Sequence, residues 1–162
     1  MTKKISVVFV CMGNICRSPT AEAVFRHYVE SAGMAGQIMI DSAGTHDYHI
    51  GDKPDARAQH AAQQRGYDMS KLRGRQVEQE DFRRFDYVLA MDSANLSMLQ
   101  RITPPGSDTR ARLFLDYARH HRERDVPDPY YGGADGFERV LDMVEDAAQG
   151  LLQEIRQQHF AG

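Results

Sequence analysis

The segment from Ile5 to Glu22 constrains the fold most strongly, because it combines a strand, a tight loop and a helix. The apolar, β-branched run ISVVFV predicts a buried strand that stops at Cys11. Ser18 followed by Pro19 is typical of a helix start, with a hydroxyl cap and proline at the first helical position. The helix is expected to bury the face formed by Ala21, Val24, Phe25, Tyr28, Val29 and Ala32.

The loop of this unit is suited to an anion. Its backbone N–H groups can form a nest beside the positive N-terminus of the helix, and Gly13 permits a positive φ or a close backbone approach. Arg17 offers a planar fork of donors for two phosphate oxygens. The same positive field favours the thiolate form of Cys11, which is a nucleophile aimed at phosphorus. The predicted phosphate-binding residues are Met12, Gly13, Asn14, Ile15, Cys16, Arg17 and Ser18.

Taken alone, Cys11 is also consistent with an inert cysteine that ends a core strand, since free cysteines are often buried. The spacing to Arg17 and the helix start directly after it favour the nucleophile. A nucleotide-binding loop of the pattern Gly-x-x-x-x-Gly-Lys-Ser/Thr is excluded, because its second glycine and its lysine are missing here.

The rest of the chain alternates strands with helices. This alternation predicts an α/β fold: a single doubly wound domain over residues 1–162, with a four-stranded parallel sheet flanked by helices on both faces. Ligands of such domains bind at the carboxyl ends of the strands, where Cys11 lies. The predicted strands are 5–10, 37–41, 87–91 and 111–115, and the predicted helices start near residues 18, 55, 92 and 135. Asp55 is predicted to cap the second of these helices, and either Asp92 or Ser93 the third.

The run VCMGNICRSPTAEAVF, with the distant Asp128-Pro129-Tyr130-Tyr131-Gly132, closely resembles the low-molecular-weight protein tyrosine phosphatases over essentially the whole chain. The resemblance implies hydrolysis of phosphotyrosine and other aryl phosphate monoesters, through a cysteinyl-phosphate on Cys11 with Arg17 binding the phosphate. It also implies phosphotyrosine-containing proteins as substrates, with a tyrosine kinase as a partner. We expect a monomer.

Cleavage of a phosphate ester by a thiolate leaves an alkoxide or phenoxide that needs a proton. The resemblance assigns this general acid to Asp128, which would then act as base for the water that hydrolyses the cysteinyl-phosphate. Without the resemblance, Asp128 is better explained as a turn residue before proline. The resemblance also makes Tyr48, Tyr130 and Tyr131 walls around an aromatic ring, although alone they are consistent with ordinary loop tyrosines.

Asn14, Ser18 and Ser42 match the supporting hydrogen-bond shell of the family, with Ser18 placed to stabilise the thiolate. The chain departs from the family at Leu72, where many relatives carry a histidine. This departure bears on how Asn14 is held and on the rate, and it leaves the predicted reaction unchanged.

Cys16 is predicted to be a redox partner of Cys11. A fully extended chain would hold the two Cα atoms roughly 16–18 Å apart. A loop curled around a phosphate brings them toward the distance of about 4.4–6.8 Å that a disulfide requires. We expect peroxide to oxidise Cys11 first, and Cys16 to capture the sulfenic acid as a reversible disulfide. The alternative is that Cys16 only packs beneath the loop.

Composition and charge bear on partners and compartment. The formal net charge of −3 gives no overall basic field, so nucleic acid and anionic membrane are not expected as partners. No apolar run approaches the ~18–20 residues of a membrane span, and the run after Lys4 is too short for a signal peptide. The two cysteines, both in the predicted site, make no disulfide framework, and they fit a reducing cytoplasm.

No metal and no other cofactor is expected, because the histidines lack metal-ligand spacing. His46, His49 and His60 are predicted to be surface residues. His120 and His121 belong to a charged stretch that is predicted to be a solvated loop.

Three alternative functions remain beside phosphotyrosine hydrolysis. Arsenate reduction uses this loop in similar proteins but needs resolving cysteines outside it, and the chain has only Cys11 and Cys16. Phosphoarginine hydrolysis occurs in close relatives that carry threonine at the position of Ile15, so Ile15 favours phosphotyrosine. A non-catalytic phosphate-binding or redox-sensing module would have no reason to keep Asp128 and its two neighbouring tyrosines.

Overall fold

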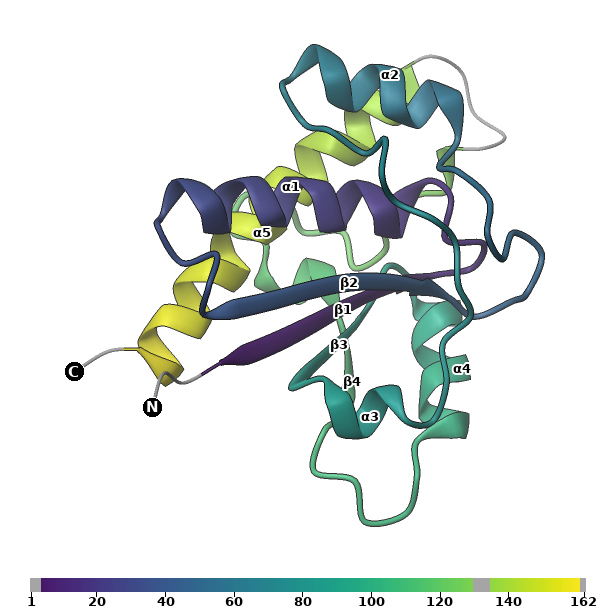
Figure 1. Ribbon diagram of the computed structural model, residues 1–162, viewed down its shortest axis with the longest axis vertical. Coiled ribbons are helices and arrows are strands. Elements are labelled where there is room, and N and C mark those ends of the chain that lie inside the picture. The colour runs from purple at the N-terminus through teal and green to yellow at the C-terminus, as the bar shows by residue number, and fades with distance from the viewer. Residues whose placement is uncertain (1–3, 130–134, 161–162) are drawn as a thin grey trace.

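A computed structural model describes residues 4–129 and 135–160, which fold around a parallel four-stranded sheet (Figure 1). The strand order is β2-β1-β3-β4, so the first strand in sequence lies inside the sheet with neighbours on both sides. The strands are β1 (Ile5–Cys11), β2 (Ile38–Gly44), β3 (Tyr87–Ala90) and β4 (Ala111–Leu113). The helices are α1 (Arg17–Ser31), α2 (Ala56–Gln64), α3 (Asp81–Arg84), α4 (Ser93–Ile102), the 3₁₀ helix η1 (Phe114–Tyr117) and α5 (Asp135–His159).

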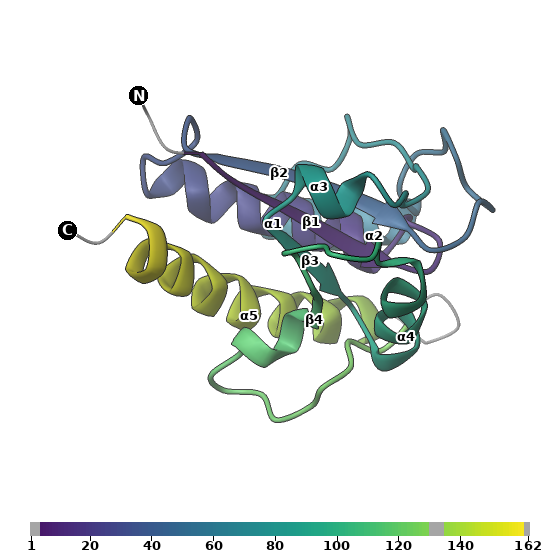
Figure 2. The same ribbon diagram turned by 90° about the horizontal axis from the view of Figure 1, so that it is seen from below.

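Helices cover both faces of the sheet, which confirms the predicted doubly wound fold (Figures 1 and 2). Alternate β1 side chains point to opposite faces, because successive residues of a strand do so. Val7 and Phe9 pack in the core with α1 and α5, whereas Val8 and Val10 pack in the core that includes Leu99 of α4. Both faces of β1 are therefore buried, which explains its continuous apolar sequence.

The residues that cap α2 and α4 agree with the sequence-based expectation, whereas the start of α1 differs from it. Asp55 caps α2 by accepting hydrogen bonds from Arg57 N and Ala58 N, and Asp92 caps α4 by accepting from Asn95 N. The predicted Ser18 cap is wrong, because α1 begins at Arg17 and has no side-chain cap. Ser18 lies inside the first turn, where its hydroxyl is directed to Cys11 instead.

The strands also shift relative to their predicted bounds. β2 continues three residues further than predicted, to Gly44, because its whole length pairs in parallel register with β1, from Ile5↔Ile38 to Cys11↔Gly44. β4 ends at Leu113, and the predicted end of that strand is the start of η1. Among the residues that the structure describes, no helix is long and apolar enough to cross a membrane.

Candidate active site

The carboxyl ends of three strands bring the candidate residues to one edge of the sheet. Cys11 ends β1 and pairs with Gly44 at the end of β2, while Val10 pairs with Ala90 at the end of β3. Asp92 follows β3 by two residues and caps α4. Parallel sheets of this kind bind their ligands at such an edge, so the fold places Cys11 where the sequence analysis expected a site.

The phosphate loop, residues 12–16, turns tightly between β1 and α1. Its sharpest point is Asn14, whose φ of 57° lies in the left-handed region. Gly13 is the residue at which the sequence most readily allows a positive φ, but the positive value falls on Asn14. Asparagine is among the residues that tolerate such a φ best. A Cβ at Gly44 would lie 2.8 Å from the carbonyl oxygen of Met12, so glycine at the end of β2 allows the loop to pack closely.

The sulfur of Cys11 has two hydrogen-bond partners. Asn14 N donates to Cys11 Sγ at 3.3 Å, and Ser18 Oγ lies 2.9 Å from the same sulfur. Ser18 Oγ accepts from Asn14 Nδ2 at 2.8 Å, so the Ser18 hydroxyl proton has two acceptors in reach, Cys11 Sγ and the Ala43 carbonyl at 3.4 Å. These contacts fix the position of the sulfur above the start of α1.

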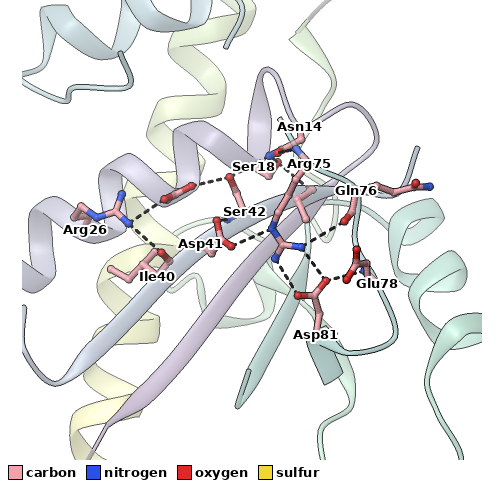
Figure 3. Close-up of polar contacts among 12 residues, drawn as sticks. Asn14, Ser18, Arg26, Ile40, Asp41, Ser42, Arg75, Gln76, Glu78 and Asp81 are labelled. Carbon is pink, nitrogen blue, oxygen red and sulfur yellow. Dashed lines mark hydrogen bonds and ion pairs between the residues drawn. The ribbon is translucent and has the colours of Figure 1, made fainter. Parts of the chain in front are cut away.

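The side chain of Asn14 is held by three hydrogen bonds, two of which join it to distant parts of the chain (Figure 3). Its Nδ2 donates to Ser18 Oγ and, at 3.0 Å, to Ser42 Oγ, and its Oδ1 accepts from Arg75 N at 3.0 Å. Leu72, which replaces the histidine of many relatives, packs against the main hydrophobic core. The support of Asn14 is thus complete without a histidine side chain at that position.

Glu22 extends this network beneath the site. Ser42 Oγ donates to Glu22 Oε1 at 2.7 Å, and Arg26 forms an ion pair with Glu22 Oε2 at 2.9 Å. Burial raises the pKa of Glu22, against the lowering effects of Ser42 and Arg26. A buried acceptor of this kind fixes the direction of the Ser42 hydroxyl, which leaves the Ser42 oxygen free to accept from Asn14.

Arg17 is buried and oriented by groups from the opposite side of the cleft. Its Nη1 lies 2.6 Å from Asp92 Oδ2 and donates to the Val126 carbonyl at 3.0 Å, while Nη2 lies 3.9 Å from Asp128 Oδ2. Burial would lower the pKa of Arg17, but the neighbouring Cys11 and Asp92 outweigh it and hold the pKa above its ordinary value. The guanidinium is therefore a buried cation with a fixed orientation.

A cavity of about 170 Å³ opens over the phosphate loop. Tyr48 stands at its rim, 65% exposed, with its ring stacked on His46 at a centroid distance of 5.0 Å. Tyr130 and Tyr131, the other predicted walls, lie outside the described residues. The residues lining the cavity are Cys11, Met12, Gly13, Ile15, Cys16, Arg17, Tyr48, His49 and Asp128.

Cys16 lines the same cavity as Cys11 but differs from it in its surroundings. Burial raises the pKa of Cys16 to about 12, and the negative charges of Asp55 and Cys11 contribute to the rise. At neutral pH Cys16 is therefore a thiol.

The segment before Asp128 is anchored to α5 by Asp146. This carboxylate accepts from Arg119 N at 2.9 Å, from His120 N at 2.8 Å and lies 2.7 Å from His121 Nδ1. The prediction of a solvated loop for the two histidines is thus only partly correct, because His121 is held against a buried partner. Further along, Val126 N donates to the Met91 carbonyl, which brings the segment to the end of β3.

Sequence reasoning missed several residues of the site. Asp92 was recognised only as a helix cap, although an acidic residue just past a strand end is a signal for a site in this fold. His49, predicted only as a surface residue, lines the cavity, and its Nδ1 lies 3.0 Å from Asp52. Nothing in the local sequence marks Glu22 or Arg75. Within the described part of the chain, no three His, Cys, Asp or Glu residues are grouped so as to hold a metal ion.

Comparison with known proteins agrees with this geometry. The family model described as "Low molecular weight phosphotyrosine protein phosphatase" matches residues 6–160. A Schizosaccharomyces pombe protein of the same description is 46% identical over 96% of this chain and 99% of its own length. A protein tyrosine phosphatase structure from Entamoeba histolytica has a TM-score of 0.92 and 38% identity, covering 95% of this chain and 98% of that one. A structure described as a Drosophila arginine phosphatase has a TM-score of 0.85 and 31% identity, and the match covers 94% of this chain and 98% of that one.

A buried cysteine and a buried arginine line one cavity at the carboxyl edge of a doubly wound sheet, and the similar proteins are described as phosphatases. The match over nearly the whole chain goes further: this chain belongs to the low molecular weight phosphotyrosine protein phosphatase family, which hydrolyses phosphotyrosine.

Proposed function

We propose that the chain hydrolyses phosphotyrosine in proteins in two steps, through a cysteinyl-phosphate on Cys11. The observation that carries the proposal is that Cys11, Arg17 and Asp128 line one cavity, where the Cys11 sulfur accepts from Asn14 N and lies 2.9 Å from Ser18 Oγ. In the first step the thiolate forms a bond to phosphorus as the phosphorus–phenol oxygen bond breaks. In the second step water displaces the thiolate and releases inorganic phosphate.

Arg17 binds and orients the phosphate in this mechanism. Because Asp92 and the Val126 carbonyl both hold Nη1, the guanidinium plane is set before substrate arrives. Preorganised charge of this kind stabilises the developing transition state without reorganisation during the reaction. The N–H groups of the phosphate loop at the start of α1 supply further donors.

Asp128 supplies the proton that the leaving phenol needs and then accepts one from the attacking water. Its carboxyl lies on the cavity wall and is 32% exposed, so that it can reach both a bound ester and solvent. Tyr48 at the rim, with Tyr130 and Tyr131, would enclose the aromatic ring of the substrate.

Phosphoarginine is the second candidate substrate, because one similar structure carries the description of an arginine phosphatase. The chain has Ile15 on the cavity wall, where the phosphoarginine phosphatases that it resembles carry threonine. Isoleucine is bulkier and more apolar than threonine, so it narrows the space for the guanidinium of phosphoarginine and favours the flat ring of phosphotyrosine. Arsenate reduction would need resolving cysteines outside the loop, and Cys11 and Cys16 are the only two in the chain.

The test is a comparison of peptides of one sequence that carry phosphotyrosine, phosphoserine or phosphoarginine, in buffer without added metal. We expect phosphotyrosine to be released with by far the highest kcat/KM. The Cys11→Ser protein, assayed in parallel, measures the background. A higher kcat/KM on phosphoserine or phosphoarginine would overturn the assignment.

We also propose that Cys16 protects Cys11 from irreversible oxidation. Peroxide converts the Cys11 thiolate to a sulfenic acid and releases hydroxide; the Cys16 thiol then displaces that oxygen as water, forming the Cys11–Cys16 disulfide. The pKa of Cys16, about 12, is raised in part by the charge of Cys11, and this charge disappears when Cys11 becomes a neutral sulfenic acid. The attacking thiol is thus easier to ionise after the oxidation than before it.

The Cys16→Ser variant tests this protection. After inactivation with peroxide, wild type is expected to regain most of its activity with dithiothreitol, whereas Cys16→Ser should stay largely inactive because its Cys11 proceeds to sulfinic acid. Mass spectrometry of the oxidised wild type should find the disulfide. Equal recovery of the two proteins would make Cys16 a packing residue only.

The remaining proposals concern the setting of the enzyme. We propose that residues 1–162 form one phosphatase domain that acts as a monomer on phosphotyrosine-containing proteins, opposing a tyrosine kinase. A reducing cytoplasm suits a nucleophilic thiol.

A further inference from the structure

Residues 74–77, here called the strap, run alongside the site without contributing to the cavity wall. Arg75 O accepts from Gly44 N at 2.8 Å, and Val77 N donates to Gly44 O at the same distance, so the strap pairs with the end of β2. On its other side, Gly74 N donates to Asp52 O at 2.9 Å and Gly74 O accepts from Gly51 N at 2.8 Å. The strap therefore joins the end of β2 to the segment that carries Tyr48 and His49.

The backbone of the strap reaches the phosphate loop through one hydrogen bond. Arg75 N donates to Asn14 Oδ1 at 3.0 Å, across 61 residues of sequence. Asn14 needs this partner because its φ is positive, and a non-glycine residue in that region persists only where its surroundings hold it. Movement of the strap would remove the hydrogen bond to Asn14 Oδ1 and leave the side chain held only by its two bonds to Ser18 and Ser42.

The side chain of Arg75 holds the strap in place (Figure 3). Its Nη1 and Nη2 bind the two oxygens of Asp81 at 3.0 Å each, and its Nε binds Asp41 Oδ2 at 3.0 Å. Asp81 is fully buried and also accepts from Glu78 N at 2.7 Å. Burial would lower the pKa of Arg75, but Asp81 and Asp41 outweigh it and raise the pKa above its ordinary value. The Arg75 guanidinium is held rigidly, because Asp81 binds its two Nη atoms and Asp41 binds its Nε.

We propose that Arg75 is a positioning residue for the phosphate site: anchored on Asp81 and Asp41, it sets the conformation of Asn14 and through it the affinity of the loop for phosphate. The inference rests on the proposed function only in taking this loop as the phosphate site. Arg75 lies outside the cavity, so it acts through Asn14 and does not touch the substrate.

The experiment measures the Kd of inorganic phosphate by calorimetry, which needs no turnover. Arg75→Met should weaken phosphate binding about two- to tenfold, the factor that corresponds to the net loss of one hydrogen bond. Arg75→Lys should restore affinity only partly, since a point charge cannot bind both Asp81 oxygens and Asp41 together. Arg83→Met is the matched control. Arg83 is an exposed arginine in α3 whose ion pair with Glu80 lies away from the cavity, so the Kd of this variant for phosphate should equal that of wild type.

Removal of Arg75 alone leaves Asp81 buried and unpaired, which threatens folding. The double variant Arg75→Met/Asp81→Asn removes both charges together and should fold while still binding phosphate more weakly than wild type. Its thermal unfolding midpoint, measured alongside the Kd, separates loss of stability from loss of affinity. A double variant that folds and binds phosphate as tightly as wild type would overturn the proposal.

A double-mutant cycle with Asn14→Ala identifies the route of the effect. If Arg75 acts through Asn14, then Asn14→Ala/Arg75→Met should bind phosphate about as weakly as Asn14→Ala alone. If instead the fold-losses of phosphate affinity in the two single variants multiply in the double variant, Arg75 does not act through Asn14. That result would contradict the proposal. Wild type without measurable phosphate affinity would instead overturn the proposed function itself.

Discussion

Cys11→Ser is expected to abolish turnover and to retain phosphate binding. A serine hydroxyl is a far weaker nucleophile than a cysteine sulfur unless a general base activates it, so the variant has no competent nucleophile at this position. The loss should be on the order of 10⁴–10⁶ in kcat, the scale found when a covalent nucleophile is removed from a hydrolase. Phosphate affinity should persist, because Arg17 and the loop backbone remain in place with Asp92 and Val126 still holding Arg17.

Three measurements check this expectation: kcat on an aryl phosphate, the Kd of inorganic phosphate, and rapid acid quench of wild type during turnover. The quench should trap phosphate on Cys11. Cys16→Ser is the matched control, since it makes the same exchange five residues away and should cost far less. A phosphorylated residue other than Cys11, or substantial turnover by Cys11→Ser, would refute the assignment of the nucleophile.

The candidate residues that the sequence singles out and the structure brings together around one loop are encoded locally. Cys11 and Arg17 belong to one strand–loop–helix unit, so the loop geometry follows from short-range connections. The sequence predicts Asp55 as a cap and offers Asp92 beside Ser93 as another, because a cap and the N–H groups that it binds lie within three residues of each other. Strand alternation with helices was enough to predict the doubly wound sheet.

The parts that were missed depend on contacts between distant segments. Arg75 N meets Asn14 only because the strap pairs with Gly44, and Asp146 meets His121 only because α5 packs beside η1. No periodicity in either segment reveals its partner. β2 was predicted too short for the same reason, since residues 42–44 are strand by virtue of their pairing with β1 rather than their own composition.

The error at Ser18 has a different origin. Serine before proline is typical of a cap, but a hydroxyl in the first turn can also point back toward the preceding strand. Here Cys11 Sγ and Asn14 Nδ2 both contact Ser18 Oγ, and the helix begins at Arg17, two residues before the predicted first helical position at Pro19. Contacts with Cys11 and Asn14 thus replace the usual capping role of the Ser18 hydroxyl, and candidate sites are where such local rules are expected to fail.

Asp128→Asn is expected to lower kcat/KM on phosphotyrosine by about 10²–10⁴, the contribution of a general acid. Asparagine keeps the shape of the side chain beside Arg17 and loses the transferable proton. The phenol of tyrosine has a pKa of about 10, so it leaves poorly without protonation. As the leaving phenol is made more acidic, the penalty on kcat/KM should shrink. Asp125→Asn is the control on the same segment, because Asp125 binds Ser93 away from the cavity, and any loss should be similar for all esters.

The two proposed roles of Asp128 separate in the kinetics. Because kcat/KM reports only steps up to formation of the cysteinyl-phosphate, it isolates the acid role, whereas kcat also includes hydrolysis of that intermediate. With an acidic leaving phenol, Asp128→Asn should form the intermediate nearly as fast as wild type and hydrolyse it slowly for want of a base. A burst of one phenol per enzyme should then precede a slow steady state. If the penalty on kcat/KM is the same for every leaving group, Asp128 is not the acid; if no burst is seen with the most acidic phenol, it is not the base.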